Sequence, residues 1–255
     1  MDKAKEEART RDAASSVESA TLATRNAILP PHNLDAATPE QVYNIRKFLN
    51  THVMEALQMK ADEWVESLKT TSVADFAASN RLSTLTTRLL LSMRTPYDKT
   101  KLSYLVYLQY QLDLFHTHFP FRKSVVAFSE EKGVPLVVLR NMLALFTDAS
   151  QADNGFTDYL MPKQKKDQLI LYMLVIALTV NGFSLDLTEL ATDLKRSAAS
   201  LTMYCRQLGC AVEKVKAETA VYGSNALASK KQAHRAVLTL PLQFPQPKRG
   251  GPARR

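Results

Sequence analysis

Apolar residues recur at helical spacing along most of the chain, and the clearest examples lie between residues 183 and 216. A first stripe has the i, i+3, i+4 and i+7 spacing of an amphipathic helix and consists of Leu187, Leu190, Ala191 and Leu194. A second stripe repeats that spacing and consists of Leu201, Tyr204, Cys205 and Leu208. Two short helices joined by about three residues are the helix-turn-helix arrangement, although any two packed helices share this pattern.

Capping residues frame both of these predicted helices. Asp186 and Glu189 have the spacing of a capping box, which satisfies free backbone N–H groups at a helix start. Ser197 can cap the second helix, and Gly209 stands where a helix end favours a left-handed residue. These signals predict helix boundaries on both sides of the turn.

The chain upstream reads as a leader followed by a linker. Residues 1–27 mix charges with Ala, Ser and Thr, which predicts a disordered leader. Residues 28–96 begin with closely spaced prolines, which favour extended backbone. From Thr38 onward the sequence predicts helices. The helical stripes expected in this linker are Val42–Val53, Trp64–Leu68 and Leu82–Met93.

Residues 97–162 are predicted to form a first compact module. An apolar face on 102–115 predicts a long helix, Gly133 ends a short helix, and Pro135 opens a third one. The turn sequence Asp153-Asn154-Gly155 then predicts a small hairpin between strands at 145–147 and 156–160. Three helices followed by a hairpin are the order of a winged helix.

Residues 163–245 repeat that order and predict a second winged helix. The apolar run Leu169–Leu178 is too short to span a bilayer and predicts a helix buried on all sides. After the helix pair, strands at 210–216 and 236–240 flank a long basic loop, which we interpret as a wing. The predicted fold is mainly α with small β hairpins: a tandem winged helix preceded by a helical linker.

Positive charge is concentrated in the last quarter of the chain. The net charge is +8, and residues 193–255 hold 12 Lys and Arg against 3 Asp and Glu, whereas the remainder holds 21 against 22. Clustered cations of this kind bind nucleic-acid phosphates and release counterions. Few Asn, Gln or Arg residues lie on the exposed face of the second helix, so we expect non-specific binding of duplex DNA. The predicted DNA-binding residues are Lys195, Arg196, Arg206, Lys214, Lys216, Lys230, Lys231 and Arg235.

The tail at 246–255 is basic and too poor in apolar residues to fold. We expect its cations to act either as a nuclear-import signal or as an additional DNA tether. Its cations are Lys248, Arg249, Arg254 and Arg255.

Signals for catalysis, metals and membranes are weak. The chain has no phosphate-cradling Gly-rich loop, no GxSxG motif and no paired acidic motif. His116 and His118 form an HxH pair without a Cys or acid at ligand spacing, so we expect no metal. Cys205 and Cys210 form no disulfide framework and suit a reducing compartment. We therefore expect no catalytic residues, no cofactor, no membrane segment and no secretory signal.

Four segments, taken in their order and spacing, resemble the A-forty-nine subunit family of RNA polymerase I. They are LPPHNLDAATPEQVY, GFSLDLTELATDLKRSA, LGCAVEKVK and LTLPLQFP, and the resemblance covers about residues 27–245. It implies a non-catalytic RNA polymerase I subunit with a DNA-binding tandem winged helix over the polymerase cleft. It also implies support of ribosomal RNA gene initiation and elongation, other polymerase subunits as partners, and a nuclear, nucleolar location.

One part of the family pattern is missing from the sequence. The family also has an N-terminal half-barrel domain that dimerises with a smaller subunit, and we expect nothing before Ile28 to form it. The chain is then either a fragment or the product of a lineage that lacks or separates this domain. The alternative function, from another class, is a winged-helix protein-interaction scaffold of a TFIIE-like transcription factor with little direct DNA contact.

Overall fold

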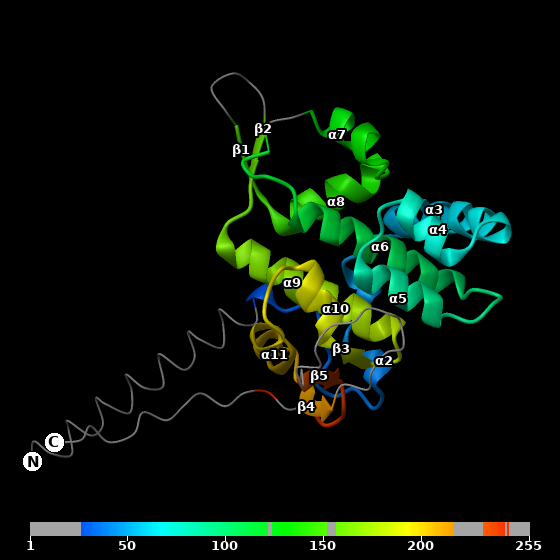
Figure 1. Cartoon of the computed structure of the whole chain (residues 1–255). Helices are drawn as coiled ribbons and strands as arrows, with labels where there is room; N and C mark the ends of the chain where they lie inside the picture. Colours follow the sequence, from blue (N-terminus) through cyan, green and yellow to red (C-terminus); the bar gives the residue numbers. More distant parts are fainter. Residues whose placement is uncertain (1–26, 122–123, 152–156, 217–231, 243, 245–255) are drawn as a thin grey trace, which may run out of the picture.

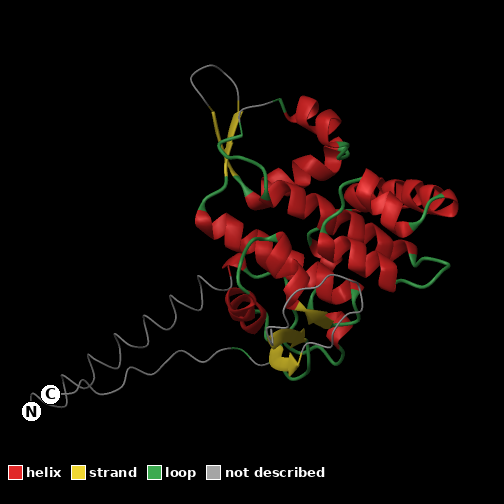
Figure 2. Cartoon of the chain, viewed as in Figure 1, coloured by secondary structure: helices red, strands yellow, loops and turns green. Residues whose placement is uncertain are grey.

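The computed structural model (Figure 1) describes residues 27–121, 124–151, 157–216, 232–242 and 244. Helices dominate these residues, and the strands form two small antiparallel sheets (Figure 2). The prediction of a mainly helical fold with small β hairpins is therefore confirmed. The predicted leader, except Ala27, and the basic tail at 246–255 lie outside the described residues.

The segment before residue 97 consists of helices of very different length. They are α2 (Pro39–Val42), a 3-10 helix (Ile45–Lys47), α3 (Thr51–Thr70), α4 (Val73–Ser79) and α5 (Thr84–Ser92). The predicted helix start at Thr38 is confirmed, because Pro39 occupies the first turn of α2.

The stripe at 42–53 does not form a single helix, which makes that prediction wrong. Tyr43 has an extended backbone and pairs with His32 in an isolated β-bridge, so α2 ends after one turn. Its hydroxyl donates to the carbonyl oxygen of Leu208 at 2.7 Å, a contact across 165 residues. The next long helix starts only where the Asn50 side chain accepts a hydrogen bond from the N–H of Val53 at 2.9 Å. A distant tertiary contact here overrides the local helical pattern.

The first unit contains three helices and a hairpin. Its elements are α6 (Lys99–Phe115), α7 (Val125–Lys132), α8 (Leu136–Phe146), β1 (Asp148–Gln151) and β2 (Thr157–Leu160). Gly133 ends α7 with a left-handed φ of 63°, as predicted. The expected first strand at 145–147 is wrong, because these residues complete α8 and the N–H of Thr147 still donates to Leu143 at 3.0 Å. The predicted turn at 153–155 lies outside the described residues.

The second unit adds a strand that the sequence did not predict. Its elements are α9 (Lys163–Val180), β3 (Ser184–Asp186), α10 (Leu187–Asp193), α11 (Ala198–Gln207), β4 (Ala211–Lys216) and β5 (Gln232–Val237). The sheet order is β3-β5-β4, with every neighbouring pair antiparallel. At three residues, β3 is too short for an alternating pattern to reveal it. The loop predicted as a wing falls almost entirely within residues 217–231, outside the described residues.

The two units share an order of pairing. In the second unit, β3 follows the first helix and pairs with the returning strand β5. In the first unit, Phe121 follows the first helix and pairs with Tyr159 of the returning strand β2. The assignment of these units as winged helices, and the boundaries between them, stay predictions.

A single apolar core extends from Leu29 to Leu238 and includes residues of all three segments. Helices α6 and α9 pack against each other in its centre (Figure 1). Every residue from Leu169 to Leu178 is buried, which confirms the prediction of a fully buried helix. In the linker segment, Trp64 of α3 packs edge-to-face on Phe76 of α4 with ring centroids 5.4 Å apart. Among the described helices, none has both the length and the apolar character needed to cross a membrane.

Candidate nucleic-acid interface

Local hydrogen bonds build the helix pair that carries the predicted DNA-binding residues. Asp186 caps α10 by accepting from the N–H of Thr188 at 2.8 Å, and Ser197 caps α11 by accepting from that of Ser200 at 3.2 Å. The expected capping box is only half formed. Glu189 forms an ion pair with Arg88 of α5 at 2.9 Å, so its carboxylate is directed toward another helix.

The turn between α10 and α11 holds Lys195 in an unusual backbone conformation. Its φ is 51°, in the left-handed region, and its side chain is exposed. The N–H of Lys195 donates to Thr192 at 3.1 Å and that of Arg196 donates to Ala191 at 2.9 Å. These two bonds form a Schellman motif, in which glycine is the usual left-handed residue. A lysine at this position presents a cation at the start of α11.

Gly209 serves the corresponding position at the end of α11. Its φ is 79°, and the N–H of Cys210 donates to the carbonyl of Cys205 at 3.0 Å, which completes a second Schellman motif. Both cysteines are free and buried. Burial raises the pKa of the Cys210 thiol to about 12 and also raises that of Cys205. Both groups are therefore protonated at neutral pH, and the burial of Cys205 agrees with its place in the apolar stripe of the second predicted helix.

The acidic side chains of α10 are engaged in packing on α5. The Asp193 carboxylate accepts from the backbone N–H groups of Thr84 at 3.0 Å and Leu85 at 2.8 Å, which caps the first turn of α5 from more than 100 residues away. His116, the C-cap residue of α6, bonds through Nε2 to the Asp193 carbonyl at 2.8 Å. With Asp193 and Glu189 directed inward, Lys195 and Arg196 are the charged residues left at the turn.

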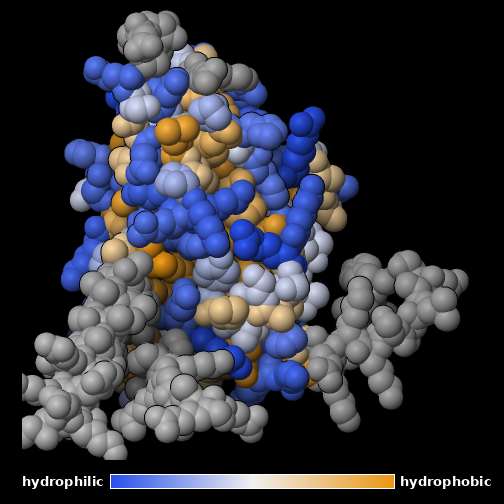
Figure 3. Space-filling view, turned by 90° about the vertical axis from the view of Figure 1, so that its left-hand side faces the viewer, coloured by the Kyte–Doolittle hydropathy of each residue, from blue (hydrophilic) through white to orange (hydrophobic). Residues whose placement is uncertain are grey.

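Arg206 lies on the outward face of α11. Ala199, Met203 and Arg206 follow at positions i, i+4 and i+7 and are all exposed, with Met203 at 65%. This face carries one cation and few groups able to hydrogen-bond to base edges. Figure 3 shows the side of the molecule that is on the left in Figure 1, where hydrophilic residues are interspersed with hydrophobic ones.

The sheet separates two of the predicted DNA-binding residues. Arg235 of β5 stands opposite Asp186 on one neighbouring strand and Glu213 on the other, so it shares a face with two acids. Lys214 pairs with His234, the residue before Arg235, and therefore projects from the opposite face. The sequence indicated alternation along each strand but not which residues would face one another.

The structure thus brings some of the eight predicted cations together and separates others. Lys195, Arg196 and Arg206 belong to one helix-turn-helix surface. Lys214 and Arg235 lie on opposite faces of the adjoining sheet. Lys230, Lys231 and the side chain of Lys216 lie outside what the structure describes.

Sequence reasoning missed a hydrogen bond that supports this surface. The hydroxyl of Tyr204 on α11 donates to Oδ1 of Asp167 on α9 at 2.6 Å. Burial, followed by the neighbouring carboxylate of Asp167, raises the pKa of Tyr204 to about 12. Tyr204 was assigned only to the apolar stripe of α11, and no sequence signal pairs it with a residue 37 positions away.

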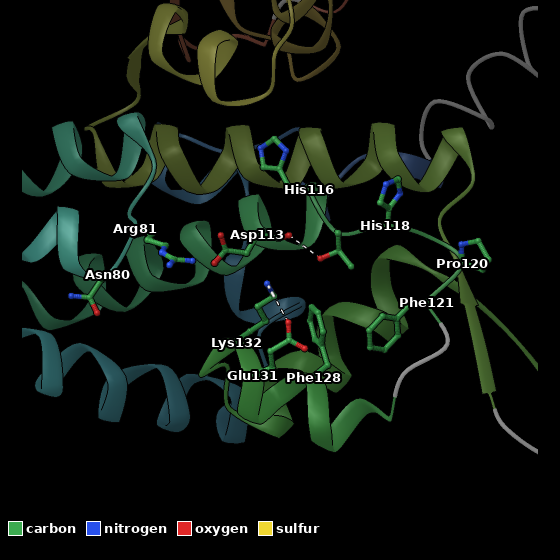
Figure 4. Close-up of a pocket in the computed structure, with 11 residues that line it drawn as sticks. Asn80, Arg81, Asp113, His116, His118, Pro120, Phe121, Phe128, Glu131 and Lys132 are labelled. Atoms are coloured by element: carbon green, nitrogen blue, oxygen red, sulfur yellow. Dashed lines mark hydrogen bonds and ion pairs between the residues drawn. The ribbon is translucent and has the colours of Figure 1, made fainter.

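A cavity of about 720 Å³ lies in the first unit, between residues 80–81, the end of α6 and α7 (Figure 4). Asp113 lies on its floor and accepts a hydrogen bond from Nε2 of Gln109 at 3.0 Å, while desolvation raises its pKa. Lys132 and Glu131 on its wall are 3.7 Å apart. With Arg81 included, the cationic and acidic side chains of the lining balance, so its charge favours no particular class of ligand. Within the described residues, no three His, Cys, Asp or Glu side chains are grouped to hold a metal ion.

Comparison with known proteins gives the wider relationship of the chain. The family model of the A49-like RNA polymerase I associated factor matches residues 1–245. DNA-directed RNA polymerase I subunit RPA49 of Homo sapiens is 25% identical over 217 residues, which cover 84% of this chain and 49% of that protein. DNA-directed RNA polymerase I subunit rpa49 of Schizosaccharomyces pombe is 29% identical over a region that covers 46% of this chain and 26% of that protein. RPA49 of Saccharomyces cerevisiae is 24% identical over a region that covers 72% of this chain and 44% of that protein.

The chain spans about half or less of the length of these relatives. The family model, by contrast, covers nearly all of the chain, including both units and the segment before them. The resemblance noted from four sequence segments is thereby confirmed, and the chain belongs to the family of A49-like RNA polymerase I associated factors.

Proposed function

We propose that the chain is a non-catalytic part of RNA polymerase I that binds duplex DNA without sequence preference. The observation that carries the DNA-binding part is the charge distribution on the α10–α11 pair. Its acids Glu189 and Asp193 are bonded to α5, whereas Lys195 and Arg206 are exposed. Each cation that neutralises a phosphate releases condensed counterions, which supplies affinity independent of base sequence.

The topology of both units supports the winged-helix part of this proposal. The second unit runs helix, strand, helix, helix, strand, strand, and its first strand pairs with its last. The first unit follows the same order with a single bridge in place of the first strand. In winged helices of this order, α11 corresponds to the helix that approaches DNA.

The outward face of α11 supports binding without base readout. Base edges are recognised mainly by Arg, Lys, Asn and Gln side chains. Ala199 and Met203 occupy two of the three exposed positions on this face, which leaves Arg206 as its cation. Contacts from such a surface go mainly to phosphates, which position a protein but specify no sequence.

The family gives this activity its proposed setting. The relatives are described as subunits of DNA-directed RNA polymerase I, so we take other subunits of that enzyme as partners of this chain. On this proposal the chain lies near the polymerase cleft, supports initiation and elongation on ribosomal RNA genes, and is located in the nucleus and nucleolus. The binding of DNA by α10–α11 would then hold the template close to the enzyme.

Titration of the full chain against a labelled random-sequence duplex at several salt concentrations tests the DNA-binding proposal. We expect a dissociation constant on the order of 1–100 μM that weakens steeply as salt rises. The double charge reversal Lys195→Glu/Arg206→Glu should abolish binding without lowering the melting temperature, because both side chains are exposed. Lys69→Glu/Lys99→Glu is a matched charge reversal at exposed lysines of α3 and α6. It should bind DNA more tightly than the Lys195→Glu/Arg206→Glu variant does. Absence of binding by the wild-type chain at low salt would refute the proposal.

A protein-interaction scaffold is the second candidate function. Met203 is 65% exposed at the centre of the outward face of α11 and offers an apolar contact to a protein partner. Arg235, flanked by two acids, is also a poor phosphate ligand. Purification of the chain with a multisubunit polymerase, combined with absent duplex binding, would favour this function over the first.

A further inference from the structure

The start of α9 carries a cluster of lysines that the charge count of the sequence did not reveal. Lys163, Lys165 and Lys166 lie within four residues, and Asp167 is the acid next to them. Three lysines against one aspartate leave a local excess of two positive charges. The residues before 193 are nearly neutral in sum, so this excess was hidden in the total.

The stability of α9 does not explain these lysines. The N-terminus of a helix carries a partial positive charge, so acids stabilise it and cations do not. The first turn of α9 has no acidic residue and no side-chain cap. Among the described residues, none of the three lysines forms an ion pair with a carboxylate, whereas Lys60 and Lys69 of α3 each pair with a glutamate of their own helix.

Two of the three lysines attach α9 to the first unit. Nζ of Lys165 donates to the carbonyl of Leu145 in the last turn of α8 at 3.1 Å. Nζ of Lys166 lies 4.3 Å from the ring centroid of Phe115 at the end of α6, which is a cation–π contact. Both side chains are half-buried. Lys163 is exposed and has no side-chain partner among the described residues, so it is the lysine available to a ligand.

The start of α9 also lies next to α11. Tyr204 of α11 donates its hydroxyl to Oδ1 of Asp167 at 2.6 Å, so the acid of the cluster is already bonded. Lys163 precedes Asp167 by four residues, which places the two on the same face of α9 with Cβ atoms about 6 Å apart. Tyr204 directly follows Met203, so this contact is on the flank of the outward face of α11. Figure 1 shows the start of α9 between the β1–β2 hairpin and α11, on the side that Figure 3 views directly.

We propose that Lys163 contacts a backbone phosphate of the duplex bound by α10–α11, and that Lys165 and Lys166 add positive potential beside it. This inference rests on the proposed DNA-binding function and extends its surface from α11 to the helix that follows the first unit. Lysine binds phosphate as a point charge on a flexible stem, so Lys163 needs reach and not a fixed geometry. Lys165 and Lys166 act without contact, because charges closer than about 8 Å are incompletely screened at physiological salt.

The arrangement fits an extended polyanion better than a single small anion. One exposed lysine does not enclose a small anion, and the other two lysines are engaged with Leu145 and Phe115. Duplex DNA carries one charge per about 1.7 Å of its axis, so one duplex can meet cations on neighbouring helices together. Lys163 would then add one contact to those of Lys195 and Arg206.

Titration of the full chain with the same random-sequence duplex at several salt concentrations tests the inference. Lys163→Gln should lower the slope of log K against log salt by about 0.9, the value for one phosphate contact, and weaken binding roughly eightfold at 0.1 M salt. Arg206→Gln should have an effect of the same kind. The double variant should lower the slope by about 1.8, because both residues contact one duplex. Lys163→Arg keeps the charge and should bind as the wild type does.

Lys101→Gln is the matched control. Lys101 is also an exposed lysine in the first turn of a long helix, but Asp98 caps that helix and Lys99 beside it pairs with Asp62 of α3. Its variant should leave the slope unchanged. If Lys163→Gln changes the slope no more than Lys101→Gln does, the inference is overturned and the proposed function stands. No duplex binding by the wild-type chain would overturn both.

A contact measurement distinguishes direct binding from a long-range effect of charge. Lys163→Cys and Lys101→Cys each place one reactive thiol on the surface, because the native Cys205 and Cys210 are buried. After labelling with a photoactivatable crosslinker, the duplex should crosslink strongly to position 163 and weakly to position 101. Equal yields at the two positions would overturn the inference.

Discussion

Lys195 combines a backbone role with a proposed charge role. Its φ of 51° lies in the left-handed region, where side chains other than that of glycine are strained. The Schellman motif at the end of α10 requires this conformation. Strain in such a position often accompanies function, and here the proposed function is the presentation of a cation at the start of α11.

The substitution Lys195→Gly should separate these two roles. Glycine relieves the left-handed strain but adds entropy to the unfolded chain, so we expect a gain of about 0.5 kcal/mol in the free energy of unfolding. The same variant should weaken duplex binding, because one phosphate contact is lost. Urea unfolding and anisotropy titration measure the two effects.

Lys195→Ala is the control for this prediction. Alanine removes the charge but keeps the strain, so it should weaken DNA binding as much as glycine does without the gain in stability. If both variants lose stability equally, the left-handed conformation of Lys195 is not a source of strain.

At the scale of single residues, the sequence correctly predicted the helix caps, because local hydrogen bonds determine them. The caps at Asp186 and Ser197 and the left-handed Gly209 are confirmed, because their partners lie within a few residues. The neighbours of Arg235 and Tyr204 could not be predicted in the same way. They depend on strand register and on the packing of α11 against α9, which bring together residues far apart in the chain.

At the scale of elements, the contact between α10 and α5 joins the linker segment to the second unit. Asp193 accepts two backbone N–H bonds at the start of α5, and Glu189 pairs with Arg88 one turn further along. A carboxylate at a helix N-terminus also interacts favourably with the helix dipole. The acids of α10 therefore contribute to packing, and in the proposed complex with DNA they are directed away from the duplex.

Asp193→Ala should lower the free energy of unfolding by about 2 kcal/mol, because it leaves two N–H groups of α5 without their acceptor. Urea denaturation followed by far-UV circular dichroism measures this loss. Asp62→Ala is the control: Asp62 forms an exposed ion pair with Lys99 at 2.9 Å, and its loss should cost less than about 1 kcal/mol. Equal losses for the two variants would contradict the role assigned to Asp193.

Elements with a strong local sequence pattern were predicted well, and elements that depend on tertiary pairing were not. The buried helix α9 and the strand β4 agree with their sequence signals to within a few residues. The stripe at 42–53 was read as one helix, but Tyr43 forms tertiary bonds that end α2 after a turn. Strand β3 has no local signal, since it exists only through its pairing with β5.

At the scale of the whole molecule, one core joins the linker segment and both units. Tyr43 bonds to Leu208, and Phe48 packs on Tyr172 with ring centroids 4.7 Å apart, so residues 28–96 contact the second unit directly. Shared burial of this kind couples the stability of segments that the sequence divides into a linker and two modules.

We therefore expect the chain to unfold in one cooperative transition. Trp64 is the single tryptophan and lies buried in α3, so its fluorescence reports on the surroundings of this linker helix. Far-UV circular dichroism reports on helices of the whole chain. The two signals should give the same midpoint in urea. An earlier transition at Trp64 would show that the linker helices unfold independently.

The sequence by itself determined the helical class, the main helices, the caps of the α10–α11 pair and the location of the positive charge. These features depend on residue type and on neighbours a few positions away, which the linear pattern records. Only the tertiary structure decided that the segment before residue 97 shares the core, that the acids of α10 face α5, and that Arg235 lies between two acids. Those outcomes depend on packing and register between distant segments, where the free energy of burial outweighs local preference. The predicted surface of eight cations consequently becomes, among the described residues, a smaller surface at the turn and outward face of α11.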